Sequence, residues 1–199
     1  MVLMSRYPDK YFDLAIVDPP YGIGANKMTL GNGKKKINRG LSDWDSAIPS
    51  KEYFEELFRV SKNQIIWGGN YFTEYLRPSS SWLFWDKGTG NNDFADGELA
   101  WTSLGGALRK VSKSWVGANA KDGIERLHPT QKPIYLYEWV LKKYGNIGYK
   151  ILDTHLGSGS IAIACHNYGF DLVACELDES YFSTAMKRIE QHTSQTKLF

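Results

Sequence analysis

The stretch Asp153-Thr-His-Leu-Gly157-Ser-Gly159-Ser160 decides the fold of this 199-residue chain. Ile151 and Leu152 before it predict a buried strand that ends at Asp153, and an apolar helical pattern begins after Gly159. Glycines at a strand-to-helix turn let a ligand approach the backbone and the N-terminus of the helix. The stretch therefore predicts an α/β fold with a ligand site at the end of this strand.

Strand and helix patterns alternate on both sides of this turn. The expected strands lie at residues 14–18, 64–67, 82–85, 151–153 and 172–176, and the expected helices at 50–60, 133–144, 160–164 and 178–192. Such alternation implies parallel strands joined by right-handed crossovers. We expect one domain over residues 1–199, built on a doubly wound, Rossmann-like sheet with helices on both faces.

Three segments lack the hydrophobic periodicity that indicates a helix or a strand. Residues 22–49 are rich in Gly and Lys and predict a basic surface loop, residues 86–127 are irregular, and residues 193–199 predict a flexible tail. Four of the five basic residues of the first segment could neutralise DNA phosphates, and they are Lys34, Lys35, Lys36 and Arg39. A solvated loop without a ligand explains the same composition equally well.

Composition excludes several classes of protein. Hydrophobic residues make up 42% and charged residues 23%, and no apolar run approaches the roughly 20 residues needed to cross a bilayer. The N-terminus shows no signal peptide, so we expect a cytoplasmic protein without a membrane partner. Cys165 and Cys175 are expected to be free thiols, and no metal site is predicted. The net charge of +2 does not by itself indicate a nucleic-acid partner.

Glu176 strengthens the prediction of a ligand site. It ends the strand that follows the glycine turn, about 20 residues along the chain, where a carboxylate accepts both ribose hydroxyls of an adenosine cofactor. A dinucleotide is disfavoured, because Ala162 stands where the third glycine of that fingerprint would be. The glycine turn and Glu176 could also have a purely structural role, without binding a ligand.

Asp18-Pro19-Pro20-Tyr21 also ends a predicted strand, so it can share the carboxyl edge of the sheet with the glycine turn. An exocyclic amine is a poor nucleophile, and acceptors for both of its hydrogens favour the form that attacks a methyl sulfonium. Asp18 supplies one acceptor and the rigid carbonyl of Pro19 a second, while the Tyr21 ring can stack on a planar base. A plain proline turn is the alternative.

The order of these motifs resembles the permuted β class of DNA amino-methyltransferases. It runs from Asp18-Pro-Pro-Tyr21 through His128-Pro-Thr-Gln-Lys-Pro133 and the glycine turn to Glu176, and it covers nearly the whole chain. This resemblance implies S-adenosyl-L-methionine as cofactor and duplex DNA as substrate, in DNA methylation such as that of restriction–modification. In that family D-P-P-Y usually accompanies adenine, so Asp18 implies transfer to the adenine amine.

The resemblance also implies roles for particular residues. The catalytic set is Asp18, Pro19, Pro20 and Tyr21. The stretch at 128–133 is similar to one that lines the methionine end of the cofactor, and the expected cofactor-binding set is Asp153, His155, Gly157, Ser158, Gly159, Glu176, His128, Lys132 and Pro133. Thr154 and His155 depart from the family's usual Pro and Phe. Residues 86–127 correspond to a short target-recognition insertion, and a homodimer would compensate for its size.

Other readings remain open. The same amine chemistry serves three other substrates: the exocyclic amine of cytosine in DNA, an amine in RNA, and the glutamine side chain of a protein. A further alternative is an inactive relative that only binds DNA. The tail is similar at Gln195, Leu198 and Phe199 to the Q-L-x-L-F peptide that binds the replication sliding clamp, although Thr196 departs from it. A frayed or docked tail is the competing expectation.

Overall fold

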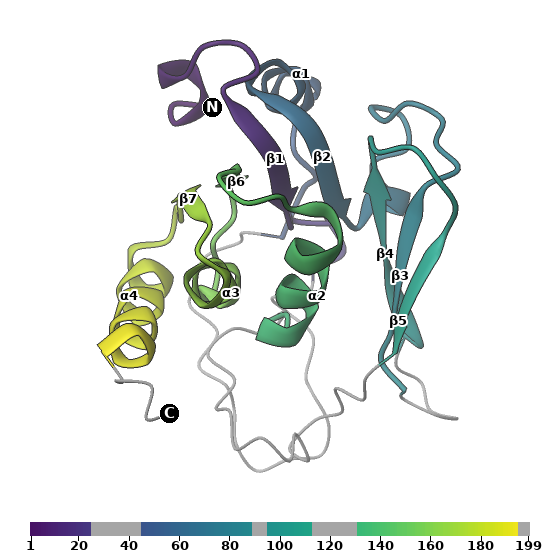
Figure 1. Ribbon diagram of the computed structural model, residues 1–199. Coiled ribbons are helices and arrows are strands. Elements are labelled where there is room, and N and C mark those ends of the chain that lie inside the picture. Colours follow the sequence, from purple (N-terminus) through teal and green to yellow (C-terminus); the bar gives the residue numbers. More distant parts are fainter. Residues whose placement is uncertain (25–44, 89–94, 113–130, 195–199) are drawn as a thin grey trace.

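The described strands form one mixed sheet of seven in the order β5-β3-β4-β2-β1-β6-β7 (Figure 1). The computed structural model describes residues 1–24, 45–88, 95–112 and 131–194. The strands are β1 (Phe12–Val17), β2 (Ser61–Trp67), β3 (Trp82–Asp86), β4 (Gly97–Thr102), β5 (Arg109–Ser112), β6 (Lys150–Asp153) and β7 (Asp171–Ala174).

One half of the sheet is parallel and the other half is mixed. β2, β1, β6 and β7 run parallel, as expected for a doubly wound sheet. β4 runs antiparallel to both β2 and β3, whereas β5 runs parallel to β3. The expectation of parallel strands alone is therefore wrong for β4. The connection from β3 to β4 is too short for a crossover helix, so β4 returns antiparallel beside β3.

Helices cover both faces of the sheet and bury a core on each (Figure 1), which confirms the predicted α/β class. They are α1 (Lys51–Val60), α2 (Ile134–Tyr144), α3 (Ser160–Tyr168) and α4 (Glu179–Ser194), with short 3-10 helices η1 (Met4–Arg6) and η3 (Gly69–Tyr71). On β1, Leu14 and Ile16 pack with α2 and α3, whereas Ala15 and Val17 pack with α1. The alternation of side chains along β1 thus supplies both cores.

The sequence located most elements, with errors at their ends. Ser50 precedes α1 as expected, although its side chain makes no capping hydrogen bond. Residues 86–127 were expected to be irregular, but the structure places β4 and β5 within this range, and both belong to the central sheet. Both cysteines are free thiols, as predicted.

Several predicted residues lie outside the described ranges. They are His128, the basic residues of the first loop (Lys34, Lys35, Lys36 and Arg39), and the tail residues Gln195, Leu198 and Phe199.

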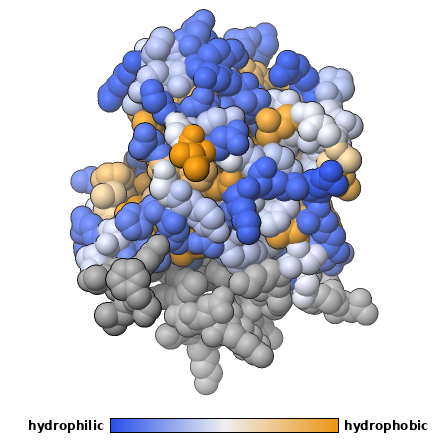
Figure 2. Space-filling view, in the orientation of Figure 1, coloured by the Kyte–Doolittle hydropathy of each residue, from blue (hydrophilic) through white to orange (hydrophobic). Residues whose placement is uncertain are grey.

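Hydrophobic side chains on the face shown in Figure 2 occur as scattered spots among hydrophilic ones, and they form no continuous patch over the described residues. Within the same ranges, no helix is long and apolar enough to cross a membrane.

Candidate functional site

The sheet brings the two predicted motifs to one edge. β1 and β6 are neighbouring parallel strands, with Leu14 opposite Ile151 and Ala15 opposite Leu152. Asp18 follows β1 and Thr154 follows β6, so both motifs leave the sheet at its carboxyl edge. β7 lies on the other side of β6, and its continuation places Glu176 at the same edge. The expected assembly of Asp18, the glycine turn and Glu176 is present.

Glu176 holds the glycine turn in place. Its Oε2 accepts a hydrogen bond of 2.8 Å from the Gly157 amide. Its Oε1 accepts bonds from the amides of Leu177, at 2.8 Å, and Asp178, at 3.0 Å. A carboxylate offers about four acceptor positions, so three backbone bonds leave capacity for a hydroxyl. Glu176 can therefore hold the turn and still receive a ribose.

The two glycines of the turn have different neighbours. Gly157 has φ +52°, and a side chain built there would meet only the His155 carbonyl, at 3.9 Å. Gly159 has φ +76°, and a side chain there would press on Ile189 at 3.0 Å. Gly157 thus leaves open space for a ligand beside the backbone, whereas Gly159 allows α3 and α4 to pack closely.

Arg188 reaches from α4 to the same turn. Its Nη1 donates to the Ser158 carbonyl at 2.7 Å and to the hydroxyls of Ser158, at 3.2 Å, and Ser160, at 3.0 Å. Burial lowers the pKa of this guanidinium. Because it fixes the carbonyl at the centre of the turn, Arg188 stabilises the conformation that Glu176 holds from the other side.

Asp153 and His155 are both held in their neutral forms by burial. Asp153 is 1% exposed, and burial raises the pKa of its carboxyl to about 8 against the hydrogen bond of 2.9 Å that the His155 amide donates to Oδ1. Burial lowers the pKa of the His155 imidazole to about 4. Thr154 Oγ1 lies 3.0 Å from His155 Nδ1 and 2.7 Å from the Tyr53 hydroxyl of α1, so the ring is fixed but uncharged at neutral pH.

Asp18 lies in a network of charged side chains. Its Oδ1 is 2.5 Å from the Lys132 Nζ and accepts a hydrogen bond of 2.7 Å from the Tyr21 hydroxyl. The same ammonium lies 3.0 Å from Glu98 Oε2, and Lys87 lies 2.5 Å from Glu98 Oε1. Lys132, expected at the cofactor's methionine end, is thus bonded to the predicted catalytic carboxylate.

The Tyr21 ring is closely surrounded. It stacks on the ring of Tyr71 with centroids 5.0 Å apart and planes 14° apart, and the edge of Phe72 lies 6.1 Å away. Gly68 has φ +69°, and a side chain there would overlap the Tyr21 ring at Cε1. Tyr71 is 43% exposed and covers the ring that was expected to stack on a base.

The remaining predicted residues lie beside these groups. Pro19 is buried and Pro20 is partly buried directly after β1, and Pro133 precedes α2 with φ −73°. Ser158 is 7% exposed, with its hydroxyl 3.2 Å from that of Ser160.

Sequence reasoning missed Glu98, Lys87, Tyr71 and Arg188. The apolar run Leu99-Ala100-Trp101 could have indicated a strand carrying Glu98. Nothing local pointed to the other three, because their contacts form only when separate elements pack together.

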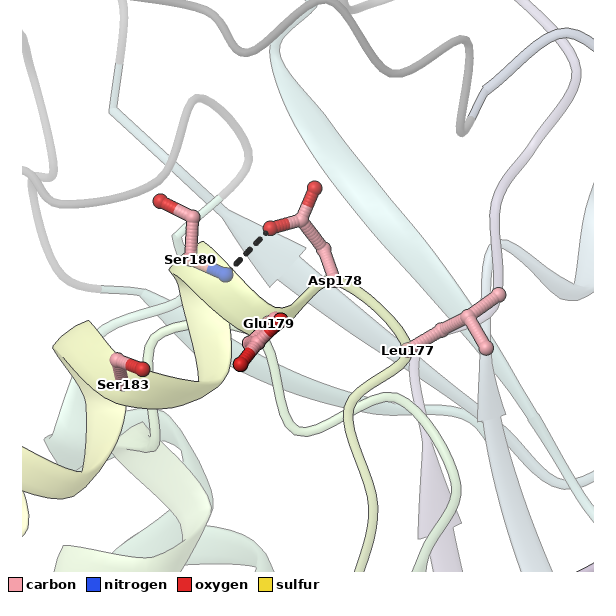
Figure 3. Close-up of a pocket in the computed structure, with 5 residues that line it drawn as sticks. All are labelled: Leu177, Asp178, Glu179, Ser180 and Ser183. Atoms are coloured by element: carbon pink, nitrogen blue, oxygen red, sulfur yellow. Dashed lines mark hydrogen bonds between the residues drawn. The ribbon is translucent and has the colours of Figure 1, made fainter.

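A shallow open pocket lies at the N-terminus of α4, directly after Glu176 (Figure 3). Leu177, which is fully exposed, lines it together with Asp178, Glu179, Ser180 and Ser183. Asp178 Oδ1 accepts the Ser180 amide at 2.9 Å, which fixes the start of the helix. Across the described ranges no group of three or more His, Cys, Asp or Glu side chains could hold a metal ion.

Comparison with known proteins gives a consistent set of similarities. A family model described as DNA methylase matches residues 105–187. The chain is 26% identical to the type II methyltransferase M2.DpnII of Streptococcus pneumoniae, over 94% of this chain and 85% of that protein. It is 24% identical to the type II methyltransferase M.HpaI of Haemophilus parainfluenzae, over 94% of this chain and 71% of that protein.

Solved structures share the fold. TTHA0409 of Thermus thermophilus, complexed with S-adenosyl-L-methionine, superposes with a TM-score of 0.61 at 15% identity, covering 98% of this chain and 93% of that one. The PvuII DNA methyltransferase, which is cytosine-N4-specific, superposes with a TM-score of 0.57 at 13% identity, covering 99% and 84%. These neighbours establish the Rossmann-like α/β fold.

Proposed function

We infer that this chain belongs to the DNA methylase family, and we propose that it transfers the methyl group of S-adenosyl-L-methionine to the exocyclic amine of adenine in DNA. One observation carries the proposal. Asp18, Gly157 and Glu176 leave three adjacent strands of one sheet at the same edge. An acceptor for an amine and a carboxylate for a ribose are therefore neighbours, as methyl transfer from an adenosine cofactor requires.

The residues of the turn fit this cofactor. Gly157 leaves open space beside its backbone, and Glu176 retains acceptor capacity for the ribose hydroxyls. Leu177 offers an exposed apolar surface next to Glu176, in the pocket of Figure 3. When bound there, S-adenosyl-L-methionine supplies a methyl group on a positively charged sulfur.

The chain's own contribution to the reaction is mainly positioning. Asp18 would accept one hydrogen of the amine and the Pro19 carbonyl the other, which would hold the nitrogen for attack. The cofactor held by the glycine turn and Glu176 would supply the methyl group to that nitrogen and keep the electron pair of the broken bond on its sulfur, and the amine would lose one proton to solvent. Alignment of this kind contributes up to about 7–11 kcal/mol in favourable systems, without a strong base.

The test is a product analysis. The protein is incubated with unmethylated duplex DNA and methyl-labelled cofactor, the DNA is digested, and the labelled nucleoside is identified. Label in the adenosine fraction supports the proposal, and Asp18→Ala should abolish it. Label in the cytosine fraction would overturn the choice of base, an outcome that the structural likeness to the PvuII enzyme makes worth testing. No label in DNA would overturn the activity.

Contacts with partners form a second part of the proposal. Lys34, Lys35, Lys36 and Arg39 contact DNA phosphates, and the insertion at residues 86–127 reads the target sequence. Replacing the three lysines by Ala should flatten the salt dependence of DNA binding, since each phosphate contact contributes about 0.9 to the log–log slope. An unchanged slope would exclude the loop from the interface.

We propose further that the protein acts in the cytoplasm as a homodimer and that its tail docks on a sliding clamp through Gln195, Leu198 and Phe199. Sedimentation of the free protein tests the dimer. Titration of labelled clamp with the full chain, and with a form ending at Ser194, tests the tail. Equal binding by both forms, or none, would exclude the docking.

A further inference from the structure

The ion pair between Lys132 and Asp18 lies almost entirely out of water. The side chain of Lys132 is 2% exposed and that of Asp18 is 16% exposed, with 2.5 Å between Nζ and Oδ1. The ammonium also lies 5.4 Å from the Trp67 ring centroid and 5.6 Å from that of Tyr21. These contacts hold the ammonium from several directions, so its position relative to Asp18 is fixed.

Glu98 completes the charge balance. A buried ammonium is stable only when its charge is matched, and Lys132 touches two carboxylates. Burial alone lowers the pKa of Lys132, but Asp18 and Glu98 outweigh it and raise that pKa. Burial raises the pKa of Glu98, but Lys132 and Lys87 outweigh it and lower that pKa. The row Asp18, Lys132, Glu98, Lys87 therefore alternates in sign and sums to zero.

The contacts on Asp18 are unequal between its two oxygens. Lys132 and the Tyr21 hydroxyl both reach Oδ1. Lys132 also lies 3.2 Å from the Tyr21 hydroxyl, so the three groups form a closed triangle around that oxygen. Fixing Oδ1 fixes the rotation of the carboxylate and hence the direction of Oδ2.

We propose that Lys132 and Glu98 are positioning residues for Asp18, and that they hold it turned so that Oδ2 accepts the hydrogen of the target amine. Lys132 acts on Asp18 directly, and Glu98 acts by holding Lys132. The inference rests on the proposed methyl transfer. It reassigns Lys132 from the cofactor to the catalytic carboxylate and gives Glu98 a role that its sequence context did not indicate.

Other ionisable groups around Asp18 do not replace this pair. Burial raises the pKa of the Tyr53 hydroxyl of α1 and of the Tyr137 hydroxyl of α2, and the nearby charge of Asp18 raises both further, so both hydroxyls stay neutral. Burial also raises the pKa of the Asp153 carboxyl to about 8, with a further contribution from Asp18, so this carboxyl is protonated at neutral pH. Among the described groups that face Asp18, Lys132 is thus the one that supplies positive charge.

The experiment compares the rate of methyl transfer and the cofactor affinity of Lys132→Met, Glu98→Gln and the control Lys62→Met. Lys62 pairs with Asp13 at 2.7 Å on β1, away from the carboxyl edge, so its loss removes a lysine–aspartate pair without touching the network. Single-turnover methyl transfer is measured at neutral pH with saturating DNA and cofactor. Cofactor affinity is measured separately by calorimetry.

For Lys132→Met we expect transfer at saturating cofactor to fall at least about tenfold, because Asp18 then loses a contact that fixes its Oδ1. Cofactor affinity should stay within about threefold, a difference of under about 1 kcal/mol. For Glu98→Gln we expect a smaller fall in transfer at unchanged cofactor affinity, because Lys132 keeps its contact with Asp18 but loses one charged partner. Lys62→Met should match the wild type in both measurements.

A loss of rate without a loss of cofactor affinity would not arise from a general loss of packing. An unchanged rate in Lys132→Met would overturn the proposal, and so would a loss of cofactor affinity as large as the loss of rate. If Lys132→Met does not fold, Glu98→Gln decides, and an unchanged rate or an equal loss of cofactor affinity overturns the proposal. A wild-type protein that methylates no DNA would instead refute the proposed function, which separates the two failures.

Discussion

The amide of Gly157 donates a hydrogen bond to Glu176 Oε2 at 2.8 Å across the gap between β6 and β7. The carboxylate expected to bind the ribose therefore also holds the loop on which we expect the cofactor to bind. Binding and loop geometry share one side chain, so a change at Glu176 affects both.

We expect Glu176→Ala to weaken binding of S-adenosyl-L-methionine by about 1–3 kcal/mol, through loss of charge-assisted hydrogen bonds to the ribose and of the bond to Gly157. Calorimetry measures the change. Glu190→Ala, which removes an exposed carboxylate from α4, is the matched control and should bind normally. Equal affinity of the Glu176 and Glu190 variants would remove Glu176 from the cofactor site.

Asp18→Asn should lower methyl transfer by far more than tenfold while cofactor affinity survives, because Asp18 faces the target amine rather than the ribose. An amide keeps the shape of the side chain, but it loses the negative charge that favours the attacking amine. Single-turnover transfer and calorimetry separate the two effects. If the variant kept more than about a tenth of wild-type turnover, a loss of under about 1.4 kcal/mol, Asp18 would have no catalytic role.

Asp153→Asn should change how stability depends on pH. In the folded protein Asp153 keeps its proton up to about pH 8, whereas in the unfolded chain an aspartate loses it near pH 4. The folded state binds more protons between these values, so the free energy of unfolding falls as pH rises through that window. Asparagine removes this contribution and can still accept the His155 amide.

Urea unfolding at about pH 5.5 and about pH 8, both inside that window, measures the effect. We expect the wild type to lose at least about 1 kcal/mol more than Asp153→Asn between the two pH values. Parallel losses in both proteins would show that Asp153 is ionised in the folded state.

Gly68→Ala should displace Tyr21. The new side chain would overlap the Tyr21 ring at Cε1, and the backbone at φ +69° already disfavours it. We expect transfer to fall at least about tenfold, because Tyr21 orients Asp18 through its hydroxyl. The matched control is Gly169→Ala, where φ is +71° and no heavy atom lies within 4 Å. Both variants carry a similar backbone strain of about 1–2 kcal/mol.

Transfer and thermal unfolding are measured for both glycine variants. A Gly169→Ala variant as slow as Gly68→Ala would trace the loss to general destabilisation rather than to the position of Tyr21.

Arg188→Met should loosen the glycine turn from the α4 side. The guanidinium holds the Ser158 carbonyl at 2.7 Å, and methionine keeps the apolar length of the side chain without the donors. We expect cofactor affinity to fall by about 1–2 kcal/mol with little change in the rate at saturating cofactor. A lower saturated rate at unchanged affinity would contradict this assignment.

Local sequence was sufficient to place groups whose position depends on their own segment. Asp18 stands directly after the apolar run at 14–17, and the glycine turn follows Ile151 and Leu152, so a run that stops at a strand end places the next residues at the sheet edge. Glu98 was missed because its function depends on β4 entering the sheet antiparallel beside β2. Lys132 was found but assigned to the cofactor by family resemblance, since no pattern around residue 132 could reveal its contact with Asp18.

The antiparallel strand was also hidden by the expectation of a doubly wound sheet. Residues 97–102 contain the apolar run Leu99-Ala100-Trp101, but the surrounding Gly and Asn residues masked it. A short connection after β3 was the available signal, because it leaves no room for a crossover helix.

β1 has a further consequence for how the site tolerates change. Leu14 and Ile16 belong to one core and Ala15 and Val17 to the other, with Asp18 next in line. One residue inserted within the strand would exchange the two sets of side chains and carry the aspartate one position beyond the sheet edge. The number of residues in β1 therefore sets the position of Asp18 in the candidate site. Function constrains the length of the strand, just as packing constrains its composition.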